Sequence, residues 1–327
     1  MFNIDIIDKK TEKELLLSDE PKTLIFTRPP SNKLCNDLNR NILSKRSDHV
    51  ISLWGNVDII NWTGLSFLKL LSNLKRLRIQ INILSGSDLS HLNYINELIE
   101  LYIGETYSDL SMMPLVKFNN TLQALFIDGE KRDLHIMSDM HNLLLLSLRN
   151  TSILNLNILR HLRNLKYLIT DLNGYNSDLL KSDIDSIEYL ELNGNGSKWT
   201  IQGEFNFPNL KHLVFVNYKR LIMPPNANFE DLGRLVFVNC NKIEGIEKVK
   251  LPKIEEIALY RNSSISNEQI KNILSKYNVN VFYMDNVNEF VNRLILFYAD
   301  RGRTINQQNF ISPEYAKLSN LDWHVRK

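Results

Sequence analysis

The sequence is short of cysteine: only Cys35 and Cys240 occur among its 327 residues, and they lie far apart. Two distant cysteines form neither a metal-ligand spacing nor a disulfide framework. Long apolar runs are also missing, because none approaches the roughly 18 residues that a membrane span requires. The start, MFNIDIIDKKTEKE, lacks a basic region followed by an apolar one, so we predict no signal peptide. These absences lead us to expect a soluble, cytoplasmic protein that enters no membrane.

An excess of charge of either sign is missing too. Lys and Arg number 39 and Asp and Glu number 37, which leaves a formal net charge of +2. Such a balance gives no global attraction to nucleic acid or to anionic membranes. The basic residues Lys75, Arg76 and Arg78 and the pair Lys219-Arg220 could contact phosphates, but they form no continuous stripe. Nucleic-acid binding is therefore a minor alternative.

The usual catalytic and ligand-binding motifs are absent as well. None of the seven histidines stands at an HxxxH or HExxH spacing. No GxSxG nucleophile motif occurs, and LNGNGSKW at 192–199 has the wrong spacing for a phosphate-binding loop. The sequence thus offers no convergent acid, base and nucleophile. We predict that the protein is not an enzyme, has no catalytic residues and binds no cofactor or metal ion.

What the sequence does contain is a repeat, clearest in residues 141–164, HNLLLLSLRNTSILNLNILRHLRN. The pattern L-x-x-L-x-L, in which other apolar residues replace some leucines, starts eleven times at intervals of 21 to 25 residues. Gly55 and Thr170 are the two non-apolar residues at the last position of the pattern. The eleven starts are Val50, Leu74, Leu98, Leu122, Leu143, Leu165, Ile187, Leu210, Leu232, Ile254 and Val279.

A small polar residue follows most starts by eight positions, with Glu130 and Tyr218 as exceptions. Its side chain should point inward and bond backbone groups where the chain leaves each strand. This role gives Cys240 a structural explanation in place of a reactive one. At the two exceptions we expect looser or bulged strand exits. The predicted structural ladder consists of Asn82, Thr106, Thr151, Asn173, Asn195, Cys240 and Asn262.

This period and signature resemble the leucine-rich-repeat superfamily, in particular its bacterial-type repeats of about 22 residues. The resemblance implies an α/β solenoid shaped like a horseshoe, with a concave parallel sheet of about 11 strands. Its convex side would consist of short helices, 3-10 turns and extended segments, and residues 61–71 could form one such helix. We expect three parts: an N-terminal cap at 1–48, the repeat array at 49–286, and a C-terminal cap helix with a tail at 287–327.

The flanking segments predict the two caps in more detail. Residues 2–6 alternate as in an edge strand, and residues 24–27 are typical of another short strand. Ser31 is expected to N-cap a helix. After the array, residues 287–298 place apolar side chains on one helical face. These caps would cover the open ends of the repeat core.

Alternation along each strand assigns the residues between the leucines to the concave face. One end of this face would hold an aromatic row that begins at Trp54, beside two arginines, and these residue types are enriched at protein interfaces. Further along, Val214, Val216, Val236 and Val238 would form an exposed apolar block, typical of a binding site unless a loop or the tail covers it. The predicted partner-binding residues are Trp54, Arg76, Arg78, Tyr102, Phe126, Arg149, Tyr167, Tyr189, Glu191, Val214, Val236, Tyr260 and Tyr283.

We therefore predict a rigid, non-catalytic module that binds another protein through its concave face and is monomeric by itself. One specific hypothesis is a cytoplasmic immunity protein that inhibits a toxin or effector. The alternatives are a scaffold or regulatory subunit of an intracellular enzyme and, from another class, a carbohydrate or nucleic-acid binder. The sequence leaves open whether the concave face, the convex face or a cap binds the partner, and it does not identify that partner.

Overall fold

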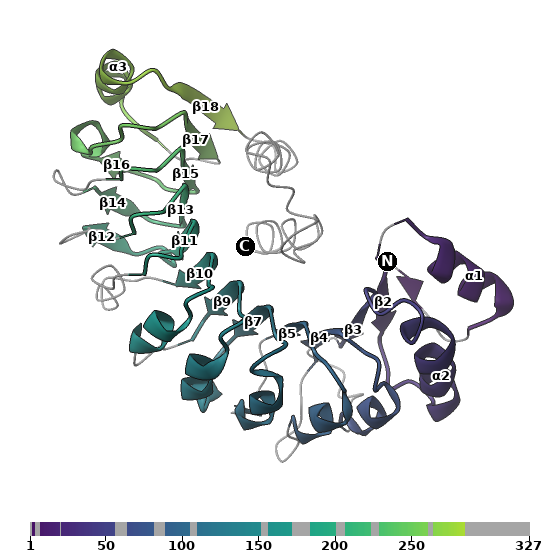
Figure 1. Ribbon diagram of the computed structural model, residues 1–327. Coiled ribbons are helices and arrows are strands. Elements are labelled where there is room, and N and C mark those ends of the chain that lie inside the picture. The colour runs from purple at the N-terminus through teal and green to yellow at the C-terminus, as the bar shows by residue number, and fades with distance from the viewer. Residues whose placement is uncertain are drawn as a thin grey trace. The chain divides into compact units, whose positions relative to one another are not determined.

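The computed structural model describes residues 2–3, 7–19, 21–55, 64–81, 89–104, 110–151, 156–171, 184–200, 207–223, 229–260 and 264–284. The chain divides into two compact units, residues 1–143 with 148–153 and residues 144–147 with 154–327. The main sheet has 13 strands in the order β1-β2-β3-β4-β5-β7-β9-β10-β11-β13-β15-β17-β18 (Figure 1). Within the described segments, no helix is long and apolar enough to cross a membrane.

The first unit alternates strands with short helical returns. Its main-sheet strands are β1 (Phe2–Asn3), β2 (Thr23–Phe26), β3 (Val50–Trp54), β4 (Arg76–Gln80), β5 (Glu100–Ile103) and β7 (Ala124–Asp128). The returns contain the 3-10 segments η2 (Ser66–Leu70), η3 (Ser90–Tyr94), η4 (Met113–Phe118) and η5 (Leu134–Asp139), and β6 (Leu110–Ser111) pairs with β8 (Lys131–Arg132). The helices α1 (Lys9–Leu17) and α2 (Asn32–Asp37) and the π-helical η1 (Leu38–Leu43) precede the repeats.

In the second unit, three consecutive returns begin with a short strand. Strand β9 (Leu145–Arg149) contributes residues to both units. It is followed by β10 (Tyr167–Asp171), β11 (Tyr189–Asn193), β13 (His212–Val216), β15 (Arg234–Val238), β17 (Glu256–Tyr260) and β18 (Asn280–Met284). The returns contain η6 (Leu156–His161), β12 (Lys198–Thr200), β14 (Arg220–Ile222), β16 (Ile243–Glu244), η8 (Ile246–Lys248) and α3 (Asn267–Lys276).

The leucine positions of the repeat build the core. In the clearest repeat, Leu143, Leu146 and Leu148 at the strand expose 1% or less of their surface, as do Leu159 and Leu162 on the return. Side chains on strand and return therefore pack against each other, and stacking of successive repeats buries them. Every strand pair with a described register is parallel. The eleven predicted strands all form, and the first 48 residues add β1 and β2 to the same sheet.

The strand register corrects the predicted frame in the first and last repeats. Val50, which was predicted to align with Leu74, pairs with Arg76. Consequently Leu53, not Gly55, is level with Ile79. In the last repeat, residue 283 is level with Leu259, which lies one residue away from the predicted frame, and the predicted partner-binding role of Tyr283 stays a prediction.

The N-terminal segment contains the predicted capped helix and one helix that the sequence did not predict. Ser31 accepts a hydrogen bond from the Leu34 backbone N–H (3.2 Å) and begins α2, as expected. The additional helix α1 starts at Asp8, whose carboxylate accepts from the Thr11 N–H (2.7 Å) and has a lowered pKa because of this bond. An N-terminal cap of this kind satisfies backbone donors that have no partner within the helix.

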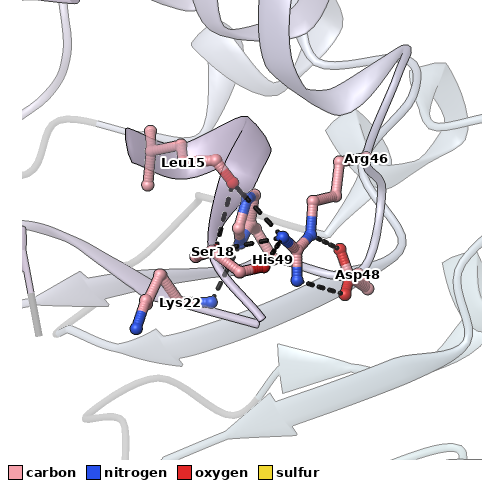
Figure 2. A network of polar contacts seen from close by, with 6 residues as sticks. All are labelled: Leu15, Ser18, Lys22, Arg46, Asp48 and His49. Atoms are coloured by element: carbon pink, nitrogen blue, oxygen red, sulfur yellow. Dashed lines mark hydrogen bonds and ion pairs between the residues drawn. The ribbon is translucent and has the colours of Figure 1, made fainter. Parts of the chain in front are cut away.

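Figure 2 shows a polar network that joins the end of α1 to the start of β3. The Nδ1 atom of the buried His49 accepts a hydrogen bond from the Lys22 N–H (2.9 Å), and its Nε2 lies 3.1 Å from the Leu15 carbonyl. Arg46 donates to the backbone carbonyl of Ser18 and pairs with Asp48 (2.9 Å). These side chains satisfy carbonyls that the end of α1 leaves open.

The described part of the helix predicted at 61–71 is the 3-10 segment η2, and Leu65, Leu68 and Leu71 are buried there. The later helix α3 was not predicted, although Ser266 and Gln269 form a complete capping box at its start. The predicted C-terminal cap helix and tail lie outside the described residues.

Candidate protein-binding surface

Opposite the buried leucines, the alternate side chains of the strands lie on one face, which we call the sheet face. Because the strands pair in register, these side chains form three columns. In the first unit the columns are Val50, Arg76, Glu100 and Ala124; Ser52, Arg78, Tyr102 and Phe126; and Trp54, Gln80 and Asp128. In the second unit they are Tyr167, Tyr189, His212, Arg234 and Glu256; Ile169, Glu191, Val214, Val236 and Ala258; and Asp171, Asn193, Val216, Val238 and Tyr260.

On the first unit, aromatic and arginine side chains are neighbours, as predicted, but their arrangement differs. The rings of Tyr102 and Phe126 lie 6.1 Å apart, and Tyr102 is level with Arg78. Trp54 is level with Gln80 in the third column, so the aromatic row predicted to begin at Trp54 does not form with Tyr102 and Phe126. The cause is the register of β3, which lies two residues away from the predicted frame.

On the second unit, the sheet face combines aromatic and charged side chains. The ring centroid of Tyr189 lies 6.2 Å from that of Tyr167 and 4.9 Å from that of His212. The Tyr189 hydroxyl donates a hydrogen bond to Glu191 (2.7 Å), and Arg234 pairs with Glu256. Strands about 4.8 Å apart hold such neighbours in fixed positions.

Most of the predicted partner-binding side chains are buried, which corrects the expectation of an exposed face. Trp54 exposes 40% of its surface, and Tyr102 is half-buried. The valine block is buried too, with no member above 1% exposed. The residues that expose 7% or less are Arg76, Arg78, Phe126, Arg149, Tyr167, Tyr189, Glu191, Val214, Val236 and Tyr260.

In the first unit, the accessible part of the sheet face lies mainly where the strands end. Trp54 is exposed at the end of β3, Gln80 and Asp128 are half-buried at the ends of β4 and β7, and the half-buried Tyr102 lies in the adjacent column. We call these four residues the strand-end rim. The predicted roles in partner binding remain predictions.

Two ladder residues occupy the inward position that the sequence predicted. The Thr151 hydroxyl donates to the Arg149 carbonyl (2.8 Å), and the Cys240 sulfur lies 3.4 Å from the Val238 carbonyl. Burial raises the pKa of Cys240 to about 12 and that of Cys35 to about 11, so both stay protonated thiols at neutral pH. Four further ladder residues lie outside the described residues: Asn82, Thr106, Asn173 and Asn262.

Asn195 departs from the predicted ladder. Its side chain is exposed and donates to Asp171 (3.1 Å), so the inward orientation predicted for it is wrong. Asn193, two residues earlier, is fully buried and donates to both Asp171 and Asn195.

The two exceptional positions are not loose exits. Tyr218 is fully buried, and a Cβ atom on Gly194 would lie 2.3 Å from its ring, so the glycine makes room for it. At Glu130 the side chain is exposed, and the neighbouring Lys131 ammonium donates to the Asp128 carbonyl (2.7 Å). Tyr218 thus fills its strand exit, and Lys131 bonds a backbone carbonyl at the exit beside Glu130.

A row of left-handed asparagines was missed by the sequence interpretation. Asn150, Asn217 and Asn239 follow strands β9, β13 and β15 directly and have φ values of 49°, 56° and 52°. Asparagine tolerates this conformation better than most residues. The Asn239 amide donates to Asn217 (2.7 Å), and the Asn150 amide donates to Asp128 (2.8 Å). Their recurrence seven residues after a repeat start was the signal available in the sequence.

A second feature that the sequence did not predict is an apolar area on the returns of the first unit. Tyr94 on η3 is 57% exposed, and Met113 and Val116 on η4 are 48% and 43% exposed. Lys117 donates to the carbonyls of Asn93 (2.5 Å) and Ile95 (2.7 Å), which joins the two segments. In the described parts of the chain, no group of three or more His, Cys, Asp or Glu side chains could hold a metal ion.

The repeat length, the parallel in-register sheet and the buried leucine positions together define the architecture. The chain has the leucine-rich-repeat fold. No protein-family profile matches it, and no curated protein sequence matches it. Among solved structures, it is similar to internalin C2 of Listeria monocytogenes, with 19% sequence identity over 49% of this chain and 69% of that chain and a TM-score of 0.34. This likeness is too distant to bear on function.

Proposed function

We propose that the chain is a non-catalytic module that binds another protein through the strand-end rim of its sheet face. The observation that supports this proposal most directly is the 40% exposure of Trp54 on the sheet face, whose described apolar side chains are otherwise mostly buried. Exposing a large aromatic side chain to water is unfavourable, and tryptophan and tyrosine dominate the binding energy of many interfaces. Trp54 is also held on a paired strand, so little ordering entropy is lost on binding.

The finer part of the proposal concerns the partner. A recognition module whose sequence contains none of the usual catalytic motifs suits an immunity protein that occupies the active site of a toxin or effector. We propose that it acts in the cytoplasm and is monomeric without its partner. A scaffold or regulatory subunit of an enzyme is the alternative, and a carbohydrate or nucleic-acid binder is a third.

The test is capture of partners from the native host with wild-type protein and with the double variant Trp54→Ala, Tyr102→Ala. We expect the double variant to lose at least about tenfold in affinity, because each aromatic hot spot contributes about 2 kcal/mol or more. Tyr94→Ala, which removes an exposed aromatic ring from the returns, is the matched control and should bind normally. An unchanged affinity of the double variant would remove the strand-end rim from the proposal. Rescue of cells that express the captured partner would decide for the immunity role.

A further inference from the structure

A second surface, separate from the sheet face, lies on the short strands of the second unit. Strands β12, β14 and β16 form a three-stranded parallel sheet (Figure 1). In β14 and β16, Leu221 and Ile243 are paired in register and expose 2% or less, so they face the core. Alternation therefore places the residues just before them, Arg220 and Lys242, on the outer side. Lys198 is paired directly with Arg220, which extends the same column to a third strand.

This basic column consists of three cations at equal spacing in the sequence. Lys198, Arg220 and Lys242 are each 22 residues apart and all are exposed. Lys219, next to Arg220, is exposed as well. Among the described residues of the three strands and those directly preceding them, Glu244 is the one carboxylate, and it pairs with Arg220 (2.8 Å) and Lys242. These strands and the residues directly preceding them therefore carry four cationic side chains and one carboxylate.

Sheet stability does not explain the column. Like charges directly opposite each other on neighbouring strands are destabilising, and parallel strands bring them to about 4.8 Å. Hydrogen bonds from Arg220 and Lys242 lower the pKa of Glu244 to about 2, so this carboxylate is fully ionised near neutral pH. Its negative charge is already included in the count of four cations and one anion. Among the described residues of these strands, this leaves positive charge that an external anion can neutralise.

We propose that the basic column docks an acidic, extended segment of the protein partner. This inference rests on the proposed protein-binding function and names the chemistry of part of its partner. The column crosses three strands, roughly 10 Å, which suits two or three carboxylates. In an extended segment, side chains on one side recur about every 6.6 Å, within reach of flexible lysine and arginine stems.

A nucleic acid fits the surface less well. Nucleic-acid binding normally relies on a long basic stripe and an excess of positive charge over the domain. Here the column ends at Lys242, because the residue 22 positions further on is Ser264, and the whole chain has a net charge of only +2.

The experiment measures binding of a fluorescein-labelled octaglutamate peptide by anisotropy at low salt, with octaglutamine and an eight-nucleotide thymidine strand as comparison probes. We expect octaglutamate to bind best. The triple variant Lys198→Gln, Arg220→Gln, Lys242→Gln should weaken this binding by about tenfold, since each exposed ion pair contributes modestly. Glu244→Gln removes the competing carboxylate and should tighten it. A rise in salt should weaken it, because exposed charges are screened.

The matched control is the triple variant Lys248→Gln, Lys250→Gln, Lys271→Gln, which removes the same charge from exposed lysines of the same unit outside the column. It should bind octaglutamate like the wild type. Equal weakening by both triple variants would overturn the proposal, because net charge alone would then explain binding. Absent binding of octaglutamate, or tighter binding of the thymidine strand, would overturn it too. Unchanged far-ultraviolet circular dichroism and melting of both variants would establish that they fold.

Capture from host lysate separates this inference from the proposed function. If the wild type captures a partner and the column variant captures it equally well, the inference fails and the proposed function stands. If the wild type captures no protein, the proposed function fails, and the octaglutamate titration still decides whether the column binds acidic peptide.

Discussion

The two units share one leucine frame but differ on both of their faces. In the first unit the sheet face combines Arg78, Tyr102 and an exposed Trp54, and the chain returns through 3-10 segments. In the second unit the same columns hold valines that are fully buried, and three returns begin with short strands that hold the basic column. The repeat thus determines the position of each side chain in the fold, whereas the residue types between the leucines differ from repeat to repeat. Specificity is therefore expected from residues between the leucines.

The largest effect should come from the shared frame itself. Leu101→Ala in the first unit and Leu213→Ala in the second each remove a fully buried side chain from the same position of the repeat. We expect each to lower the free energy of unfolding by about 2–5 kcal/mol, because a cavity adds to the lost burial. Urea unfolding followed by circular dichroism measures this. Leu274→Ala, at a half-exposed position of α3, is the control and should cost far less. If only one of the two variants lost little free energy of unfolding, the leucine positions of the two units would not be equivalent.

The next effect should distinguish the strand exits of the two units. Gly194→Ala would place a Cβ atom 2.3 Å from the buried Tyr218 ring in the second unit. Overpacking of this kind costs about 1–3 kcal/mol. Gly104→Ala in the first unit meets the Ile79 carbonyl at 3.2 Å, a tight contact that a small shift relieves, so its effect should stay within about 1 kcal/mol. Thermal melting of both variants tests the difference, and equal melting temperatures would contradict it.

The sequence predicted the frame well because buried leucines at a fixed period have one structural solution. It failed at the two ends of the array, where adjacent apolar residues allow more than one register. Val50, Ile51 and Leu53 are all buried, so the sequence does not reveal which of them occupy the core positions, and pairing with β4 places Ile51 level with Leu77 and Leu53 level with Ile79. At the other end, the pairing of β18 with β17 lies one residue away from the predicted frame.

The candidate site was harder to predict because exposure depends on neighbours that are distant in sequence. Alternation placed Val214 on the sheet face correctly, yet its burial follows from packing that no local pattern contains. The basic column was present in the sequence as a 22-residue spacing of Lys198, Arg220 and Lys242. It became a surface only once β12, β14 and β16 were seen to pair.

The smallest expected effect is a dependence of stability on pH that belongs to the first unit. Burial, opposed by Asp48 and assisted by Arg46, lowers the pKa of His49 below its usual value of 6.5. The unfolded chain therefore binds this proton more readily than the folded chain, and stability falls as the pH drops below about 6.5. The geometry agrees, because Nδ1 accepts from the Lys22 N–H and a protonated ring would place a second N–H against it.

The His49→Gln variant should therefore lose part of the pH dependence of its urea midpoint between pH 7.5 and 5.5. His135→Gln, at an exposed position, should keep the wild-type slope. If the urea midpoint changed equally with pH in the wild type and in both variants, the N-terminal segment around α1 would tolerate a charged His49. Hydrogen exchange of the Lys22 amide in the wild type places the effect in the first unit. We expect its protection to decrease on acidification before that of amides in β13 and β15, because the bond that protects it depends on a neutral ring.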